Sequence, residues 1–160
     1  MSAPSDSELV DFVTGEARLL DLQRLDEWLG LFAEDSHYWM PLEPDQTDPR
    51  LVASLMYEDK LLLKIRVERF KSDRTYSQRP RSRCHHVLQV PRIERRDEAG
   101  NLYVTWTPLH YVETRGDEQM LLAAWATHHL AVVDGTLKIR LKRVDLVNCD
   151  AAFGSIQLFV

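Results

Sequence analysis

The hydrophobic pattern changes its period near Cys84, and this change limits the possible folds more than any other feature of the chain. Before this point, apolar residues recur at intervals of three and four, which predicts helices. After it, long runs rich in β-branched and aromatic residues follow one another, which predicts strands. Helices followed by a succession of antiparallel strands are typical of an α+β domain with the helices on one face of the sheet.

Three helices are expected in the first part of the chain. The first follows Ser5-Asp6-Ser7, which can supply an N-cap, and its apolar positions are Leu9, Phe12, Val13, Ala17 and Leu20. The second has the helical spacing i, i+3, i+4 and i+7 at Leu25, Trp28, Leu29 and Phe32. The third is expected over residues 57–71, with one stripe made by Leu62, Ile65, Arg66 and Arg69. Between the last two, "SHYWMPL" predicts a short strand and "EPDQTDPR" a loop.

Four long strand-like runs fill the second half of the chain. They are "HHVLQVPRIERR", "NLYVTWTPLHYVETR", "EQMLLAAWATHHLAVV" and "TLKIRLKRVDLVN". The separators "DEAGN", "RGDE" and "DG" contain the glycines and acids that short hairpin turns require. We therefore expect a single domain over residues 1–160, a curved antiparallel sheet wrapped around the N-terminal helices. Such a sheet has the shape of a cone with a pocket at its open end.

Composition and charge exclude several classes of protein. A chain of 160 residues is one domain by the usual size and can build a core without disulfides. Its net charge of -5 argues against nucleic-acid binding. No apolar run approaches the roughly 20 residues that span a bilayer, and "MSAPSDSELV" lacks the pattern of a signal peptide. Two cysteines make no disulfide framework, which favours a reducing cytoplasm.

The histidines do not have the spacing of a metal site. They are His37, His85, His86, His110, His128 and His129. Neighbours on a strand point to opposite faces, so neither adjacent pair can place both rings on one ion. Cys84-His85-His86 supplies the C-x-H half of a Rieske signature, but the other half fails because Ala152, not histidine, follows Cys149 at the required distance. We expect no metal and no cofactor in this chain.

Catalytic motifs are equally scarce. The sequence contains neither a GxSxG elbow nor a glycine-rich phosphate loop. An acid–base dyad inside the cone remains an alternative, since burial shifts a pKa towards catalytic use. Its candidates are Asp35, His37, Tyr38, His110, one of His85/His86 and one of His128/His129. We favour the structural interpretation, in which Asp35 bonds the backbone at a turn and the histidines are half-buried hydrogen-bonding residues.

Glu16 lies in the middle of an apolar helix face, between Phe12, Val13 and Leu20. A buried carboxylate is costly unless it is paired. The predicted third helix offers Arg66 and Arg69 as partners. A structural ion pair or an interface contact is favoured over catalysis.

The stretch "KSDRTYSQRPRSR", residues 71–83, is rich in arginine. Its basic residues are Lys71, Arg74, Arg79, Arg81 and Arg83. A nucleic-acid site would need interleaved aromatic residues, whereas arginine suits protein interfaces because it forms bidentate bonds to carboxylates. We expect an interface here.

The tail "NCDAAFGSIQLFV" is apolar, and chain ends of this kind seldom lie in water. We expect it to form a last strand or an oligomer contact, with much of its burial between subunits. The preceding run carries basic residues that can pair with acids on a neighbour, namely Lys138, Arg140, Lys142 and Arg143. On this interpretation the isolated chain is a trimer, and removal of residues 154–160 leaves a folded but smaller or aggregating species.

Three segments resemble the small (β) subunits of aromatic-ring-hydroxylating dioxygenases, the Rieske non-haem iron enzymes of aromatic catabolism. "EARLLDLQRLDEWLGLFAEDSHYWMPL", residues 16–42, resembles the family's opening, and "PRSRCHHVLQV", residues 80–90, resembles its Pro-x-Ser-Arg stretch. "LKIRLKRVDLVNCD", residues 137–150, resembles its last long strand. "LQV" stands for the usual Ser-Asn-Val with one residue fewer, so the family histidine matches either His85 or His86.

This resemblance implies a nuclear-transport-factor-2-like (cystatin-like) fold and a subunit of an oxidoreductase. It also implies that a large (α) subunit carries the Rieske [2Fe–2S] cluster and the mononuclear iron. Three copies of each subunit would form a hexamer in which the β subunits make a trimeric base. We therefore expect a non-catalytic structural subunit. The alternatives are a stand-alone isomerase or dehydratase of the same fold that uses a His/Asp pair, and a ligand-binding or dimerisation module.

Overall fold

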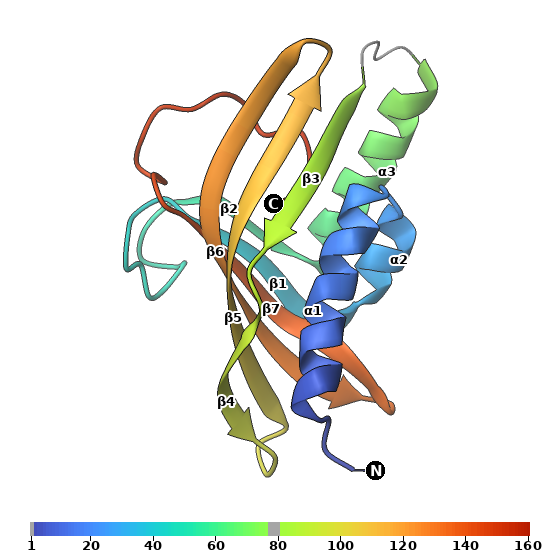
Figure 1. The fold of residues 1–160 in the computed structure, drawn as a ribbon, viewed down its shortest axis with the longest axis vertical. Helices are drawn as coiled ribbons and strands as arrows, with labels where there is room; N and C mark the ends of the chain where they lie inside the picture. Colours follow the sequence, from blue (N-terminus) through green and yellow to red (C-terminus); the bar gives the residue numbers. More distant parts are fainter. Residues whose placement is uncertain (1, 77–80) are drawn as a thin grey trace.

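One curved sheet organises the fold, and the helices lie together on its concave side (Figure 1). The computed structural model describes residues 2–76 and 81–160. In chain order its elements are α1 (Asp6–Asp21), α2 (Leu25–Gly30), β1 (Phe32–Pro41), β2 (Ser54–Asp59), α3 (Lys60–Tyr76), β3 (Ser82–Leu88), β4 (Arg92–Asp97), β5 (Leu102–Arg115), β6 (Glu118–Val133) and β7 (Thr136–Leu146). In the described ranges, no helix is both long and apolar enough to cross a membrane.

Helix α1 begins where the local sequence predicts. The Ser5 hydroxyl accepts a hydrogen bond from the Glu8 backbone N–H, and the Ser5 backbone N–H donates to the Glu8 carboxylate. This reciprocal capping box satisfies two N–H groups that the first turn of a helix otherwise leaves open. The predicted N-cap is therefore confirmed.

The sheet follows the order β2-β1-β7-β6-β5-β3, and β4 also pairs with β5. All of its pairs are antiparallel except β1 with β7, which run parallel. The long connection between these two strands includes α3 and the hairpins β5–β6 and β6–β7. The expected curved sheet around N-terminal helices is confirmed, with one parallel pair in place of a wholly antiparallel meander.

The third helix begins later than its sequence pattern suggests. Residues 57–59 belong to β2, and α3 begins at Lys60. Among the described side chains of α3, Leu63 and Val67 are buried, both 0% exposed, whereas Leu62 and Ile65 are each 47% exposed. The predicted buried stripe was therefore wrong by about one position. Several faces of this helix carry leucine or isoleucine, and only packing against the sheet determines which face is buried.

Two further predictions were wrong in detail. The run "HHVLQVPRIERR" forms two strands, β3 and β4, which are separated by residues 89–91 and both pair with β5. Pro91 has no N–H to donate, so a continuous ladder cannot pass through it. The tail forms no strand; residues 147–160 are turns and irregular chain.

The inner face of the sheet holds the core. Trp28 of α2 lies at its centre, 0% exposed, with its ring centroid 4.9 Å from that of Phe32 and 4.4 Å from that of Phe159. Tyr38 of β1 is also 0% exposed, and its ring lies 6.3 Å from Trp28. Side chains alternate along a strand, so the neighbours of these inward residues point to the opposite, outer face.

Candidate functional site

A buried charge network joins α1 to the middle of the sheet. Glu16 is 2% exposed and accepts hydrogen bonds from Lys142 Nζ at 2.6 Å and Trp28 Nε1 at 2.7 Å. His128 Nε2 lies 3.3 Å from the second carboxylate oxygen. Burial alone raises the pKa of Glu16, but the Lys142 ammonium and the His128 ring outweigh it and hold this pKa well below its usual range. Glu16 is thus an ionised member of a structural ion pair.

The partners of Glu16 are not those that the sequence suggested. Arg66 instead binds Glu58 of β2. Lys142, which we had assigned to an acid on a neighbouring subunit, binds Glu16 of its own chain. The helical wheel placed Glu16 correctly on a buried face, but the partner depends on which residue of β7 faces inward there.

The end of the C-terminal tail packs into the core beside this network. Tyr38 Oη donates to the main-chain oxygen of Val160 at 2.8 Å. Phe159 and Val160 are 4% and 1% exposed. Glu113 of β5 holds the preceding residues, because its Oε1 accepts from the backbone N–H groups of Gln157 and Leu158 at 3.0 and 2.8 Å. The end of the tail is therefore part of this chain's own core, contrary to our assignment of much of its burial to contacts between subunits.

The candidate dyad residues do not share one site. Tyr38 points inward, whereas His37 lies on the outer face and stacks on Tyr57, with ring centroids 4.8 Å apart. Asp35 is exposed on β1. His110 is exposed on β5, which β7 and β6 separate from β1.

The adjacent histidine pairs divide between the two faces, as strand geometry predicts. His86 and His128 are buried, 8% and 1% exposed, and His85 is exposed. His129 is half-buried, and burial together with the neighbouring His128 lowers its pKa.

Asp21, Cys84 and His86 form a group that sequence spacing did not reveal, because Asp21 comes from the end of α1. Their ligand atoms all lie within 4.8 Å of one another, a spacing that could hold a metal ion. The Asp21 carboxylate already lies 2.6 Å from His86 Nδ1 and accepts from the His86 backbone N–H at 3.0 Å. Burial and the nearby Asp21 raise the pKa of the Cys84 thiol to about 12. These hydrogen bonds hold the end of α1 against β3.

We expect the isolated chain to bind no stoichiometric iron or zinc, because an ion at this group would have to displace the Asp21–His86 bond and ionise a protonated thiol. Elemental analysis of protein purified with and without chelator measures this directly. Cys84→Ser is the matched control, since it removes the thiolate ligand alone. About one equivalent of metal that survives chelator in the parent and is lost in Cys84→Ser would contradict the prediction.

The outer face of the sheet is the second candidate functional region, after the buried residues described above. Three of the chain's four tryptophans point to this face, namely Trp39, Trp106 and Trp125; register pairs Trp106 with Thr127, and Trp125 with Pro108. An antiparallel sheet that faces water on one side normally alternates apolar and polar residues. Along β5, however, the outward-facing residues are also mostly apolar, namely Leu102, Val104, Trp106, Pro108 and Val112. We did not interpret this feature of "NLYVTWTPLHYV" from the sequence.

Apolar and aromatic side chains on this face, histidine included, gather in two clusters. The edge cluster lies on β1 and β2 and consists of His37, Trp39, Leu55 and Tyr57. The groove cluster lies on β3, β5 and β6 and the start of the tail, and consists of Val87, Pro108, His110, Leu121, Trp125 and Val147. Arg143 and Asp145 of β7 separate them as an ion pair of 2.8 Å, and Arg143 also lies 4.4 Å from the ring centroid of Trp39.

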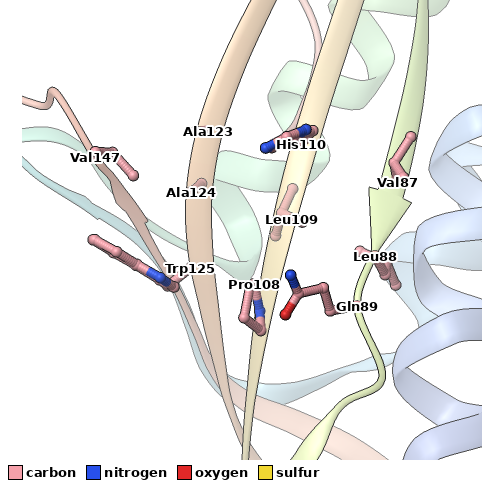
Figure 2. Close-up of a pocket in the computed structure, with 10 residues that line it drawn as sticks. All are labelled: Val87, Leu88, Gln89, Pro108, Leu109, His110, Ala123, Ala124, Trp125 and Val147. Carbon is pink, nitrogen blue, oxygen red and sulfur yellow. The ribbon is translucent and has the colours of Figure 1, made fainter.

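The groove cluster surrounds a hollow of about 350 Å³. Figure 2 shows Trp125 and Val147 on one side of it, Val87 and Leu88 on the other, and Pro108 between them. The exposed fractions are 62% for Leu121, 52% for Val87 and Val147, and 39% for Trp125. Tryptophan beside aliphatic side chains in a concave patch is typical of protein interfaces.

The arginine-rich stretch is only partly within the described residues. Lys71 forms an ion pair with Asp26 of α2 at 2.9 Å. Arg83 is exposed on β3. Arg79 and the side chain of Arg74 lie outside the described part of the chain. The expected interface at residues 71–83 therefore stays a prediction.

Comparison with known proteins identifies relatives. The sequence model of the family described as "Ring hydroxylating beta subunit" matches residues 15–151. The small oxygenase component of the p-cumate 2,3-dioxygenase system of Pseudomonas putida is 34% identical over 144 residues, which cover 86% of this chain and 76% of the relative. The 2-halobenzoate 1,2-dioxygenase small subunit of Burkholderia cepacia is 34% identical over 110 residues, which cover 65% and 67% of the two chains.

Solved structures share the fold. The β subunit of benzoate 1,2-dioxygenase from Burkholderia mallei superposes with a TM-score of 0.80 over 99% of this chain and all of that one, at 24% identity. A scytalone dehydratase-like protein from Novosphingobium aromaticivorans gives a TM-score of 0.62 at 15% identity, over 89% of this chain and 87% of that one. The expected nuclear-transport-factor-2-like architecture is confirmed by these likenesses.

Proposed function

Because the chain belongs to the family of ring-hydroxylating dioxygenase β subunits, we propose that it is the non-catalytic structural subunit of a multi-component aromatic-ring dioxygenase. Its role is to support assembly of a large α subunit that oxidises the aromatic compound. The observation that carries this proposal is the outer face of the sheet, which lies on the side away from the helices (Figure 1) and exposes apolar side chains such as Trp125 at 39% and Leu121 at 62%. A face of this kind is stable in water when another protein chain covers it.

We assign the Rieske [2Fe–2S] cluster and the mononuclear iron to the α subunit. This assignment is supported by Cys84-His85-His86, the one C-x-H segment of this chain. In it, Nδ1 of His86 is already engaged in a hydrogen bond with Asp21. The buried Glu16, Lys142 and His128 satisfy one another's charges instead of facing a substrate. The chain's own residues thus serve packing and recognition.

We assign the complex three α and three β subunits, with the β subunits as a trimer. Cyclic symmetry repeats one contact around an axis, so no copy leaves its apolar face open to water. A cytoplasmic location accompanies this assignment. It is supported by Cys84 and Cys149, which are both free thiols.

The alternative of a stand-alone isomerase or dehydratase has less support. It requires a His/Asp pair that a substrate can reach. Among the described residues, the His/Asp pair joined by a hydrogen bond is His86 with Asp21, and the His86 side chain is only 2% exposed. The likeness to a dehydratase is one of fold alone.

The test of this function is reconstitution. Co-expression with the untagged large subunit should yield a complex that retains iron and oxidises an aromatic substrate, whereas the isolated chain should not. Purification through a tag on this chain measures the partner directly. Failure to retain the large subunit at physiological salt, or turnover by this chain alone, would contradict the proposal.

Asp35→Ala and His37→Ala should lower activity of the reconstituted enzyme only as far as they lower assembly. Both residues lie on the outer side of β1, where they can contact a neighbouring chain but not the inner network. Turnover per assembled complex, measured after size-exclusion chromatography, separates the two effects. A thousandfold loss of turnover in a fully assembled variant, about 4 kcal/mol of barrier, would place catalysis in this chain.

A further inference from the structure

The end of the C-terminal tail is held by side chains and not by strand pairing. Residues 147–160 form no helix or strand, and most of residues 150–157 are exposed. Figure 1 draws the tail in red; it loops out beyond β7, and C marks its end near the middle of the sheet. Among the described residues, Glu113 and Tyr38 make the hydrogen bonds that join residues 152–160 to the rest of the chain. The tail thus contacts the core as a bound peptide does.

The contacts of Phe159 define a position for one aromatic ring. Its ring centroid lies 4.4 Å from that of Trp28, with the ring planes inclined by 33°, and 5.9 Å from that of Tyr38, edge to face at 67°. Trp28 and Tyr38 are both 0% exposed. Aromatic rings in offset and edge-to-face arrangements attract one another beyond the effect of burial. The walls of this position therefore suit a flat aromatic group.

The polar groups around this position are already paired within the chain. Glu16 accepts from Lys142 and from the indole N–H of Trp28, so its charge is balanced. The Tyr38 hydroxyl donates to the main-chain oxygen of Val160. A charged ligand would lose its hydration here without gaining a partner of opposite charge, which is costly. The surroundings therefore select a neutral aromatic molecule over an aromatic anion or cation.

We propose that the concave side of the sheet contains a binding site for a small neutral aromatic molecule, and that Phe159 of the chain's own tail occupies this site as an internal ligand. Trp28 of α2 and Tyr38 of β1 form its walls. Glu113 fixes the tail on one side of the ring, at residues 157 and 158, and the Tyr38 hydroxyl fixes it on the other side, at Val160. This inference goes beyond the proposed function, because it concerns the interior of the single chain and not its assembly.

Phe159→Ala in the full chain tests the site, with benzene as the probe. The substitution removes the ring but keeps the main-chain groups that Glu113 and Tyr38 bind. Benzene has the size of the removed ring, and an apolar cavity of that size inside a protein core can bind it. A ligand that binds only the folded state raises the melting temperature. At about ten times its Kd, benzene should raise the melting temperature of Phe159→Ala by about 3–6 °C.

Three controls define the site. The parent should show no rise, because Phe159 fills the position. Phe153→Ala, the matched variant, loses the same ring from a half-buried position of the same tail and should show no rise either. Benzoate, which adds a charge to the ring, should give no rise in Phe159→Ala. Nuclear Overhauser contacts from benzene to the ring protons of Trp28 and Tyr38 should locate the bound molecule.

A folded Phe159→Ala that benzene does not stabilise would overturn the inference. An equal rise in the parent or in Phe153→Ala would do the same, as would benzene located away from Trp28. If Phe159→Ala does not fold alone, Phe159→Val is the second variant; it leaves less space, so a smaller rise supports the site and no rise contradicts it. None of these outcomes involves the large subunit, so the proposed function stands or fails separately.

Discussion

Glu16→Ala is expected to lower the free energy of unfolding by about 3–5 kcal/mol, the usual cost of removing one partner from a buried ion pair. The Lys142 side chain is 3% exposed, so its ammonium would lose its carboxylate without gaining water. His128 and the Trp28 indole N–H would lose an acceptor at the same time. Urea denaturation at neutral pH measures the change.

Glu16→Gln should cost less, because the amide oxygen still accepts hydrogen bonds from Lys142 and Trp28. The double variant Glu16→Leu/Lys142→Met should recover much of the loss, since it removes both charges together. An unchanged urea midpoint for Glu16→Ala would show that Lys142 reaches water or another acid.

The same carboxylate makes stability depend on pH. Its pKa in the folded chain is well below the unfolded value of about 4.3, since Lys142 and His128 favour the ionised form. A group whose pKa is depressed by folding stabilises the protein above its unfolded pKa, and this contribution is lost as the pH falls towards the folded pKa. Between neutral pH and the acid range, the parent should therefore lose more stability than Glu16→Gln.

Phe159→Ala is expected to cost about 3–5 kcal/mol, as for other buried phenylalanines. Phe159 is 4% exposed, and its ring centroid lies 4.4 Å from that of Trp28 and 5.9 Å from that of Tyr38. Because these contacts lie within one chain, the loss should not depend on protein concentration. Urea denaturation at two concentrations a hundredfold apart tests both statements.

Phe153→Ala is the control, since Phe153 is only half-buried in the same tail and should cost less. Removal of residues 154–160 should now unfold the domain or leave it barely stable. We had expected a folded remnant, but the structure assigns Phe159 and Val160 to the core. A truncated chain with the parent's melting temperature would show that the tail is dispensable.

Local sequence determined most of the helices and strands. The capping box at Ser5 and Glu8 and the amphipathic face of α1 depend on residues within one or two turns of each other. Strand periodicity likewise predicts β5, β6 and β7, because side-chain alternation is a property of each strand alone. The family resemblance in residues 16–42 further predicted the overall architecture, a curved sheet around helices.

Only the tertiary structure decided which residues meet. Glu16 binds Lys142, which is 126 positions away, and Tyr38 binds Val160, which is 122 positions away. Periodicity shows that Glu16 faces inward, but the strand register in the sheet selects its partner. The sequence pattern also could not show that the end of the tail packs into the core. Nor could it show that α1 packs against the inner face of the sheet and leaves the outer face without a covering helix. A pattern encodes local geometry, whereas burial depends on segments that lie far apart in the chain.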